Sequence, residues 1–103
     1  MELCFDIKGQ TAIVTGASSG LGVTFAETLA ERGVNLVIAA RRYERLVEVA
    51  EDLSNRYNVK VVPIKTDVTQ EEQVISMVKT AVEKFGSLEI LVNNAGVASL
   101  SPS

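Results

Sequence analysis

Residues Thr15 to Gly22 read TGASSGLG, three glycines within eight residues, directly after the apolar run at residues 12–14. That run is short enough to be a buried strand. Beyond the glycines, apolar side chains recur every four residues, at Leu21, Phe25 and Leu29, and this spacing predicts a helix. The segment therefore predicts a strand, a glycine-rich turn and a helix in that order.

The alternation of apolar runs and helix-spaced side chains continues along the chain. Pro63 has no backbone N–H, so we expect its strand at an edge of the sheet. Thr69 and Glu72 have the spacing of a capping box, which predicts the start of the third helix, and Gly86 marks its end. Such alternation predicts an α/β doubly wound parallel sheet with right-handed crossovers. The expected strands are residues 11–15, 34–40, 59–64 and 88–92, and the expected helices are residues 20–32, 46–57 and 70–85.

Composition excludes several classes of function. The length of 103 residues predicts a single unit over residues 1–103. The net charge of −3 argues against non-specific nucleic-acid binding. A zinc site and a Ser-His-Asp triad are excluded because there is no histidine and only one cysteine, Cys4. No stretch reaches the ~18 apolar residues of a membrane span. We therefore expect a cytoplasmic protein without a membrane or nucleic-acid partner.

The three glycines of the loop have separate roles in this interpretation. Gly16 can make the sharp turn after the strand, Gly20 can let a phosphate approach, and Gly22 can let the helix pack closely on the strand. Unpaired N–H groups and the helix dipole favour an anion there, typically a pyrophosphate. The alternative is a tight turn without a ligand. The glycine loop follows the first strand of a βαβ unit, and this position favours the ligand site. The spacing G-x-x-x-G-x-G nevertheless differs from the commoner G-x-G-x-x-G.

Three motifs in this order resemble the short-chain dehydrogenase/reductase family: TGASSGLG, then Asp67-Val68 after the third strand, then NNAG at residues 93–96. The resemblance runs from about Phe5 to Ala98. It implies a Rossmann-type sheet of strand order 3-2-1-4 and a nicotinamide dinucleotide as partner. In that family the glycine loop holds the pyrophosphate and adenosine ribose, the aspartate binds the adenine amino group, and NNAG lines a ribose. The cofactor-binding residues implied are Thr15, Gly16, Ser18, Ser19, Gly20, Leu21, Gly22, Asp67, Val68, Asn94, Ala95 and Gly96.

Some of these residues have simpler explanations. Asp67 could be a turn residue ahead of Thr69, and Asn94 with its neighbour Asn93 could make a turn that bonds its own backbone.

The end of the second strand indicates which dinucleotide is preferred. A carboxylate there binds the ribose 2′-hydroxyl of NAD, whereas an arginine accepts the 2′-phosphate of NADP. Here Arg41 and Arg42 follow the strand, and Glu44 is the first acid. Arg41 is the main candidate and Arg42 the second, so NADP is favoured over NAD. Against this, Ser19 stands where NADP-preferring relatives often carry a basic residue, and both arginines could simply begin a solvated helix.

No catalytic residue is predicted in the chain. The resemblance implies catalysis by a Y-x-x-x-K pair with a serine, but Val47 and Val61 stand four residues after Tyr43 and Tyr57. We therefore expect the cofactor-binding half, truncated, of an enzyme of about 250 residues. The parent would be an oxidoreductase that transfers hydride between an alcohol and a carbonyl, among ketoacyl reductases or sugar and sugar-acid dehydrogenases.

A second interpretation is a non-catalytic module that binds a nucleotide or associates with itself. In a sheet of order 3-2-1-4 the fourth strand is an exposed edge, and its apolar residues 88–92 would invite pairing with another chain. We therefore expect self-association through this strand.

Overall fold

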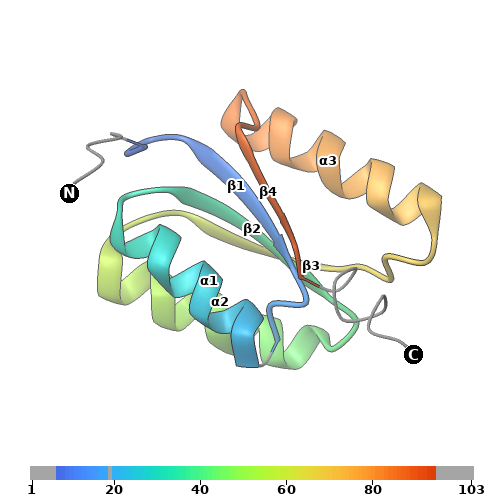
Figure 1. Cartoon of the computed structure of the whole chain (residues 1–103), viewed down its shortest axis with the longest axis horizontal. Coiled ribbons are helices and arrows are strands. Elements are labelled where there is room, and N and C mark those ends of the chain that lie inside the picture. The colour runs from blue at the N-terminus through green and yellow to red at the C-terminus, as the bar shows by residue number, and fades with distance from the viewer. Residues whose placement is uncertain (1–6, 19, 95–103) are drawn as a thin grey trace.

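Four parallel strands form the central sheet in the order β3-β2-β1-β4, flanked by helices on both faces (Figure 1). The computed structural model describes residues 7–18 and 20–94. The order of the strands and the helices on both faces confirm the predicted fold class and strand order. The strands are β1 (Thr11–Thr15), β2 (Asn35–Ala40), β3 (Val61–Lys65) and β4 (Ile90–Asn93), and the helices are α1 (Gly20–Glu31), α2 (Tyr43–Tyr57) and α3 (Glu71–Phe85).

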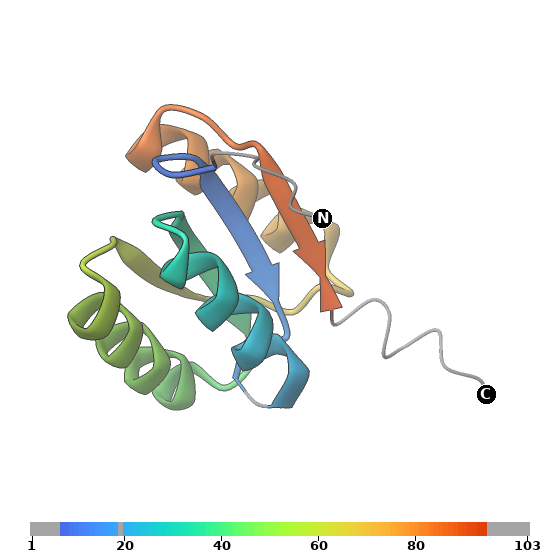
Figure 2. The ribbon, with the colours of Figure 1, turned by 60° about the vertical axis from the view of Figure 1, so that its left-hand side comes forward.

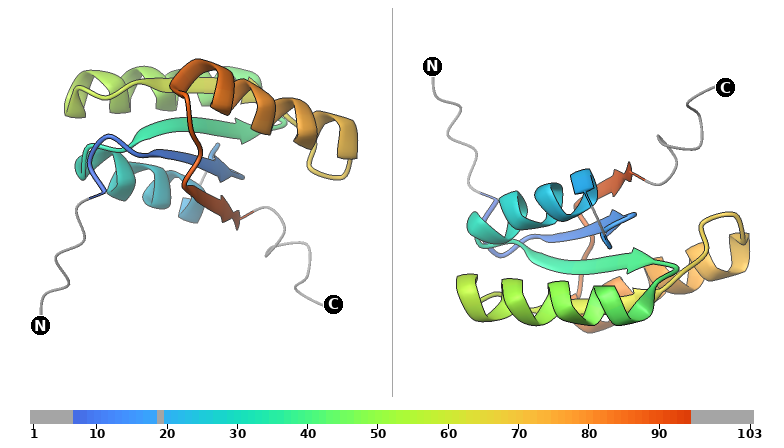
Figure 3. Two further views of the ribbon diagram at one scale, coloured as in Figure 1. Left: turned by 90° about the horizontal axis from the view of Figure 1, so that it is seen from above. Right: turned by 90° about the horizontal axis from the view of Figure 1, so that it is seen from below.

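The molecule has three layers, with α1 and α2 on one face of the sheet and α3 on the other (Figures 2 and 3). All five residues of β1 are buried, because both faces of this central strand are covered. Ala12 and Val14 join the core under α1 and α2, whereas Ile13 joins the core under α3. Side chains of a strand alternate between the faces of a sheet, so one apolar run fills both cores.

Helix α1 forms as predicted, but it rests on small residues. Gly22, Ala26 and Ala30 are its buried positions, whereas Leu21 is 58% exposed and Phe25 is also exposed. Small side chains bring the helix backbone close to the sheet, which turns the larger apolar residues outward. The four-residue apolar spacing therefore identified the helix but not its buried face.

The capping box predicted at the start of α3 is wrong. The N-cap of α3 is Gln70, and its side chain makes no capping hydrogen bond. Thr69 instead donates to Asp67 Oδ1 twice, from its hydroxyl at 2.7 Å and from its N–H at 3.0 Å. Because the Asp67 carboxylate accepts a hydrogen bond from the Thr69 hydroxyl, this hydroxyl does not cap the helix. The predicted end at Gly86 is confirmed, because Gly86 is the C-cap in the left-handed conformation.

The two edges of the sheet differ. Strand β3 lies at one edge, as Pro63 predicts, and α2 packs beside it. Strand β4 lies at the other edge and, among the described strands, pairs with β1 alone, with Ile13 opposite Leu91. Ile90 and Val92 pack against the core under α1 and α2, whereas Leu91 is 57% exposed. In the part of the chain that the structure describes, no helix has the length and apolar character needed to cross a membrane.

Candidate functional site

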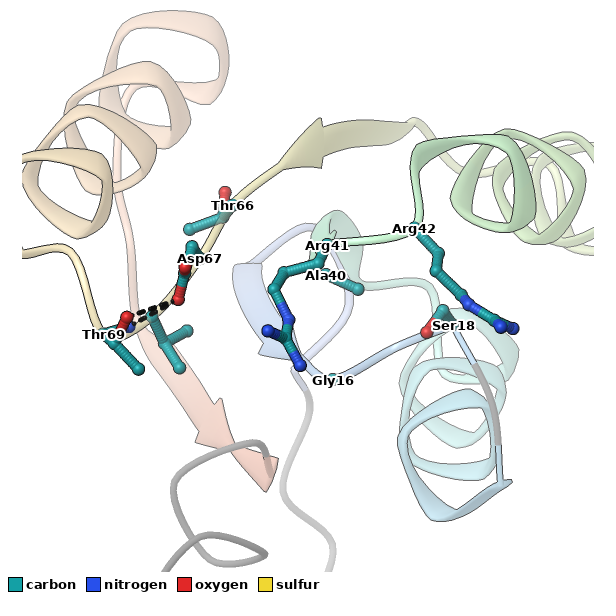
Figure 4. A pocket seen from close by; sticks show the side chains of 9 residues that line it. Gly16, Ser18, Ala40, Arg41, Arg42, Thr66, Asp67 and Thr69 are labelled. Carbon is teal, nitrogen blue, oxygen red and sulfur yellow. Dashed lines mark hydrogen bonds between the residues drawn. The ribbon is translucent and has the colours of Figure 1, made fainter.

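A pocket of about 360 Å³ opens where β1, β2 and β3 end (Figure 4). Carboxyl ends of parallel strands are where ligands bind in open α/β sheets. The volume lies within the range of small-molecule sites, about 300–1,000 Å³. Six residues predicted from the sequence meet here: Gly16, Ser18, Arg41, Asp67, Val68 and the second arginine candidate, Arg42. The remaining lining residues are Ala40, Thr66 and Thr69.

Each glycine of the loop has a structural reason to be glycine. Gly16 and Gly20 have φ angles of 67° and 55°, in the left-handed region that other residues rarely enter. A Cβ on Gly20 would meet nothing within 4 Å, so the space in front of it is open. A Cβ on Gly22 would overlap the carbonyl oxygen of Gly16. Gly16 therefore makes the sharp turn, Gly20 leaves open space for a ligand, and Gly22 lets α1 pack closely against the end of β1.

Backbone N–H groups are available where the loop enters α1. Among the described residues, Ala17 is the only loop residue whose N–H donates to a backbone carbonyl outside the helix, that of Ala39, at 3.2 Å. The N–H groups in the first turn of α1 have no carbonyl four residues earlier within the helix. That turn contains no acidic residue. Open space, N–H donors without a partner inside the helix and the positive end of the helix dipole together fit an anion such as the diphosphate of a dinucleotide.

Two arginines at the end of β2 form a positive wall of the pocket. Arg41 directly follows β2, and its guanidinium lies between the Asp67 segment and Gly16 (Figure 4). The side chain of Arg42 extends past Ser18. Both arginines are exposed, so their guanidinium groups are available to a ligand. A guanidinium in this position can pair with a phosphate through two parallel hydrogen bonds.

Asp67 is the negative group of the pocket. Hydrogen bonds from the hydroxyl and then the N–H of Thr69 lower the pKa of its carboxyl, and the positive charge of Arg41 adds to the effect. The carboxylate is therefore ionised at neutral pH and can accept a hydrogen bond from an amino group. Its backbone is held as well, because the Asp67 N–H donates to Gln73 Oε1 of α3 at 2.8 Å.

The third motif touches the first. Asn94 Nδ2 donates to the carbonyl oxygen of Gly16 at 3.4 Å. The Thr15 hydroxyl lies 3.4 Å from the carbonyl oxygen of Val92 and 3.1 Å from Asn93 Oδ1. Thr15 is only 2% exposed, so its side chain joins β1 to β4 within the protein.

Three predicted residues of the loop and α1 do not line the pocket. Gly22 is buried beneath the loop, and Gly20 and Leu21 are the first two residues of α1. Ser19, Ala95 and Gly96 lie outside the described residues.

Sequence reasoning missed several residues of the site. Thr66 and Thr69 line the pocket because they flank Asp67 and Val68 where β3 ends beside β2. Arg45 was also missed, although its Nε donates to the carbonyl oxygen of Ser18 at 3.0 Å. No pattern in the sequence indicates this contact, because its acceptor is a backbone carbonyl.

Comparison with known proteins places these features in a family. The sequence profile described as short chain dehydrogenase matches residues 10–103. An uncharacterized oxidoreductase of Staphylococcus saprophyticus is 44% identical over 92 residues, which are 89% of this chain and 39% of that protein. The chain thus spans well under half the length of that relative.

Two solved structures are similar in fold and sequence. L-sorbose reductase from Gluconobacter frateurii, complexed with NADPH and L-sorbose, has a TM-score of 0.82 and 38% identity, covering 87% of this chain and 35% of its own. A short-chain dehydrogenase/reductase from Burkholderia phymatum, in complex with NAD, has a TM-score of 0.80 and 34% identity, covering 84% and 31%. Both the profile and these likenesses agree with the glycine loop and the strand order. The chain belongs to the short-chain dehydrogenase family.

Proposed function

We propose that this chain binds NADP(H), in preference to NAD(H), in the pocket at the carboxyl ends of β1, β2 and β3. The position of Arg41 supports this most, because it lines the pocket at the end of β2, where NAD-preferring sites carry a carboxylate. Arg42 adds a second positive charge on the same wall. A 2′-phosphate in this place meets guanidinium groups, whereas the 2′-hydroxyl of NAD meets no acidic partner after β2 before Glu44.

The other parts of the cofactor have matching groups in this proposal. The diphosphate lies on the N–H groups between Gly16 and Gly22, and the adenine amino group donates to the Asp67 carboxylate beside Val68. Asn94, which contacts the glycine loop, lies toward the ribose. The nicotinamide, when bound, supplies or accepts a hydride. The residues of this chain bind and orient the dinucleotide.

For the whole protein we propose an oxidoreductase that interconverts an alcohol and a carbonyl compound in the cytoplasm. Family membership and the sugar ketone named with L-sorbose reductase support this class of reaction. We assign only cofactor binding to the 103 residues, because they contain no Y-x-x-x-K pair and hence no proton donor of the family's type.

Isothermal titration with NADP and NAD tests the preference. We expect the wild-type chain to bind NADP at least about tenfold more tightly, since a hydrogen bond to a charged group contributes about 1.5–3 kcal/mol. Arg41→Ala should remove most of this difference and leave NAD binding nearly unchanged. Arg32→Ala, an exposed arginine after α1, is the matched control and should change neither affinity. Equal affinity of the wild type for the two dinucleotides would contradict the proposed preference.

We also propose that the chain associates with itself through β4. Within residues 7–18 and 20–94, this strand has one hydrogen-bonded neighbour, and the exposed Leu91 lies on it. Unpaired strand edges with apolar side chains pair readily with another chain. In sedimentation velocity, Leu91→Lys should shift the wild-type dimer or oligomer to a monomer. Ile75→Lys on α3, also an exposed apolar position, should not. A wild type that stays monomeric at high concentration would refute the proposal.

A further inference from the structure

Arg45 joins helix α2 to the glycine loop from outside the pocket. Its Nε donates to the carbonyl oxygen of Ser18 at 3.0 Å, and its Nη1 donates to Glu48 Oε1 at 3.1 Å. Glu48 lies three residues further along α2, so the guanidinium is held by its own helix while it contacts the loop. Arg45 does not line the pocket, whereas Ser18 does. Any effect of Arg45 on a bound ligand therefore passes through Ser18.

The loop between β1 and α1 depends on a few tertiary contacts. The Ala17 N–H is bonded to the carbonyl of Ala39 in β2, and the Gly16 carbonyl accepts from Asn94. Arg45 supplies the contact for the following residue, Ser18. Glycine-rich segments lose much conformational freedom on ordering, so each such contact contributes to fixing the loop. The contact to Ser18 comes just before the N–H groups that begin α1.

The chemistry of this contact suits an anion site. A guanidinium donor on a carbonyl oxygen offsets the partial negative charge that the oxygen carries. Removing Arg45 leaves this oxygen without its charged partner and the loop with one contact fewer. Both changes weaken a site that binds a diphosphate through backbone N–H groups.

We propose that Arg45 is a positioning residue that fixes the glycine loop for diphosphate binding, in contrast to Arg41, which contacts the 2′-phosphate. This inference rests on the proposed cofactor binding and extends it to a residue outside the pocket. NADP and NAD share the diphosphate and differ at the 2′ position. Loss of Arg45 therefore weakens the binding of both dinucleotides equally, whereas loss of Arg41 weakens the binding of NADP alone.

The test combines a measurement on the free protein with titrations of the two dinucleotides. Amide hydrogen exchange of Ala17, measured by NMR without ligand, reports how firmly the loop is held against β2. The variants are Arg45→Ala and Arg45→Lys, which keeps the charge but lacks the planar fork. Arg56→Ala is the matched control, because Arg56 lies on the same helix, its side chain is 48% exposed against 50% for Arg45, and it pairs with Asp52 and Glu27.

In Arg45→Ala we expect Ala17 exchange to rise about 3- to 10-fold, with an equal loss of affinity of about 3- to 10-fold for NADP and for NAD. Arg45→Lys should lie between this variant and wild type, and Arg56→Ala should match wild type. Unchanged Ala17 exchange, or full rescue by lysine, would overturn the positioning role. A loss confined to NADP would overturn it too, because it would show direct contact with the 2′-phosphate. Faster Ala17 exchange in a protein that binds neither dinucleotide would support the loop contact and refute the proposed function.

Discussion

Replacement of Gly22 by alanine should destabilise the fold, although alanine is the better helix former. The added Cβ would overlap the carbonyl oxygen of Gly16, and it would lie 2.6 Å from the Gly16 carbonyl carbon and 3.0 Å from Ala17 Cα. All of these are backbone atoms, so no side chain can rotate away. Overpacking of this kind costs about 1–3 kcal/mol, and the helix propensity of alanine returns at most about 1 kcal/mol. Since only backbone atoms would have to move, we take the upper half of that cost, and the expected net loss is about 1–2 kcal/mol.

Thermal unfolding followed by far-ultraviolet circular dichroism measures this loss. A domain of this size shifts its Tm by about 4–8 °C per kcal/mol, so Gly22→Ala should lower the Tm by about 5–15 °C. Gly86→Ala is the control that distinguishes a loss of stability from a loss of the binding site. Its φ of 85° strains an alanine, but nothing lies within 4 Å of the new Cβ and the residue caps α3 far from the loop along the chain. Both variants should unfold more easily, and only Gly22→Ala should lose dinucleotide binding. A Gly22→Ala variant as stable as wild type, or more so, would refute the close-contact argument.

Three further predictions concern single contacts. The pKa of Glu89 is lowered by hydrogen bonds from Ser87 and from the first amide of β1, so this carboxylate stabilises the fold above its ordinary pKa of 4.5. In urea unfolding, the difference between wild type and Glu89→Gln should therefore be largest above pH 4.5 and shrink as the pH falls below it. Thr69→Val should raise the pKa of Asp67 toward its ordinary 3.8 in a carbon-detected NMR titration, and an unchanged value would count against the Thr69 hydroxyl. Ala26→Leu should cost about 1–3 kcal/mol of unfolding free energy, because Ala26 is fully buried against the sheet.

Much of the fold could be predicted from local patterns. Short apolar runs identified the strands because a parallel sheet covered on both faces buries every residue of a central strand, as in β1. Pro63 identified its strand as an edge because a missing N–H breaks a ladder. The capping box failed since a local competitor, the Asp67 carboxylate, engages the Thr69 hydroxyl. The buried face of α1 was missed because close packing, and not hydrophobicity, selects Ala26 and its small neighbours.

The site could be predicted only as far as its residues lie within motifs. Gly16, Ser18, Arg41 and Asp67 meet at one pocket, as expected when strands of order 3-2-1-4 end together. The contact from Arg45 could not be foreseen, because it depends on the angle at which α2 leaves β2 and on a carbonyl that any residue type would supply.

The diphosphate site on the glycine loop is the central claim, and a backbone-amide NMR titration with NADP tests it most directly. We predict saturable shifts of the amides of Gly16, Ser18, Gly20, Leu21 and Gly22, with NAD shifting the same amides at higher concentration. Shifts that spare these amides, or that gather on another surface of the protein, would contradict the account.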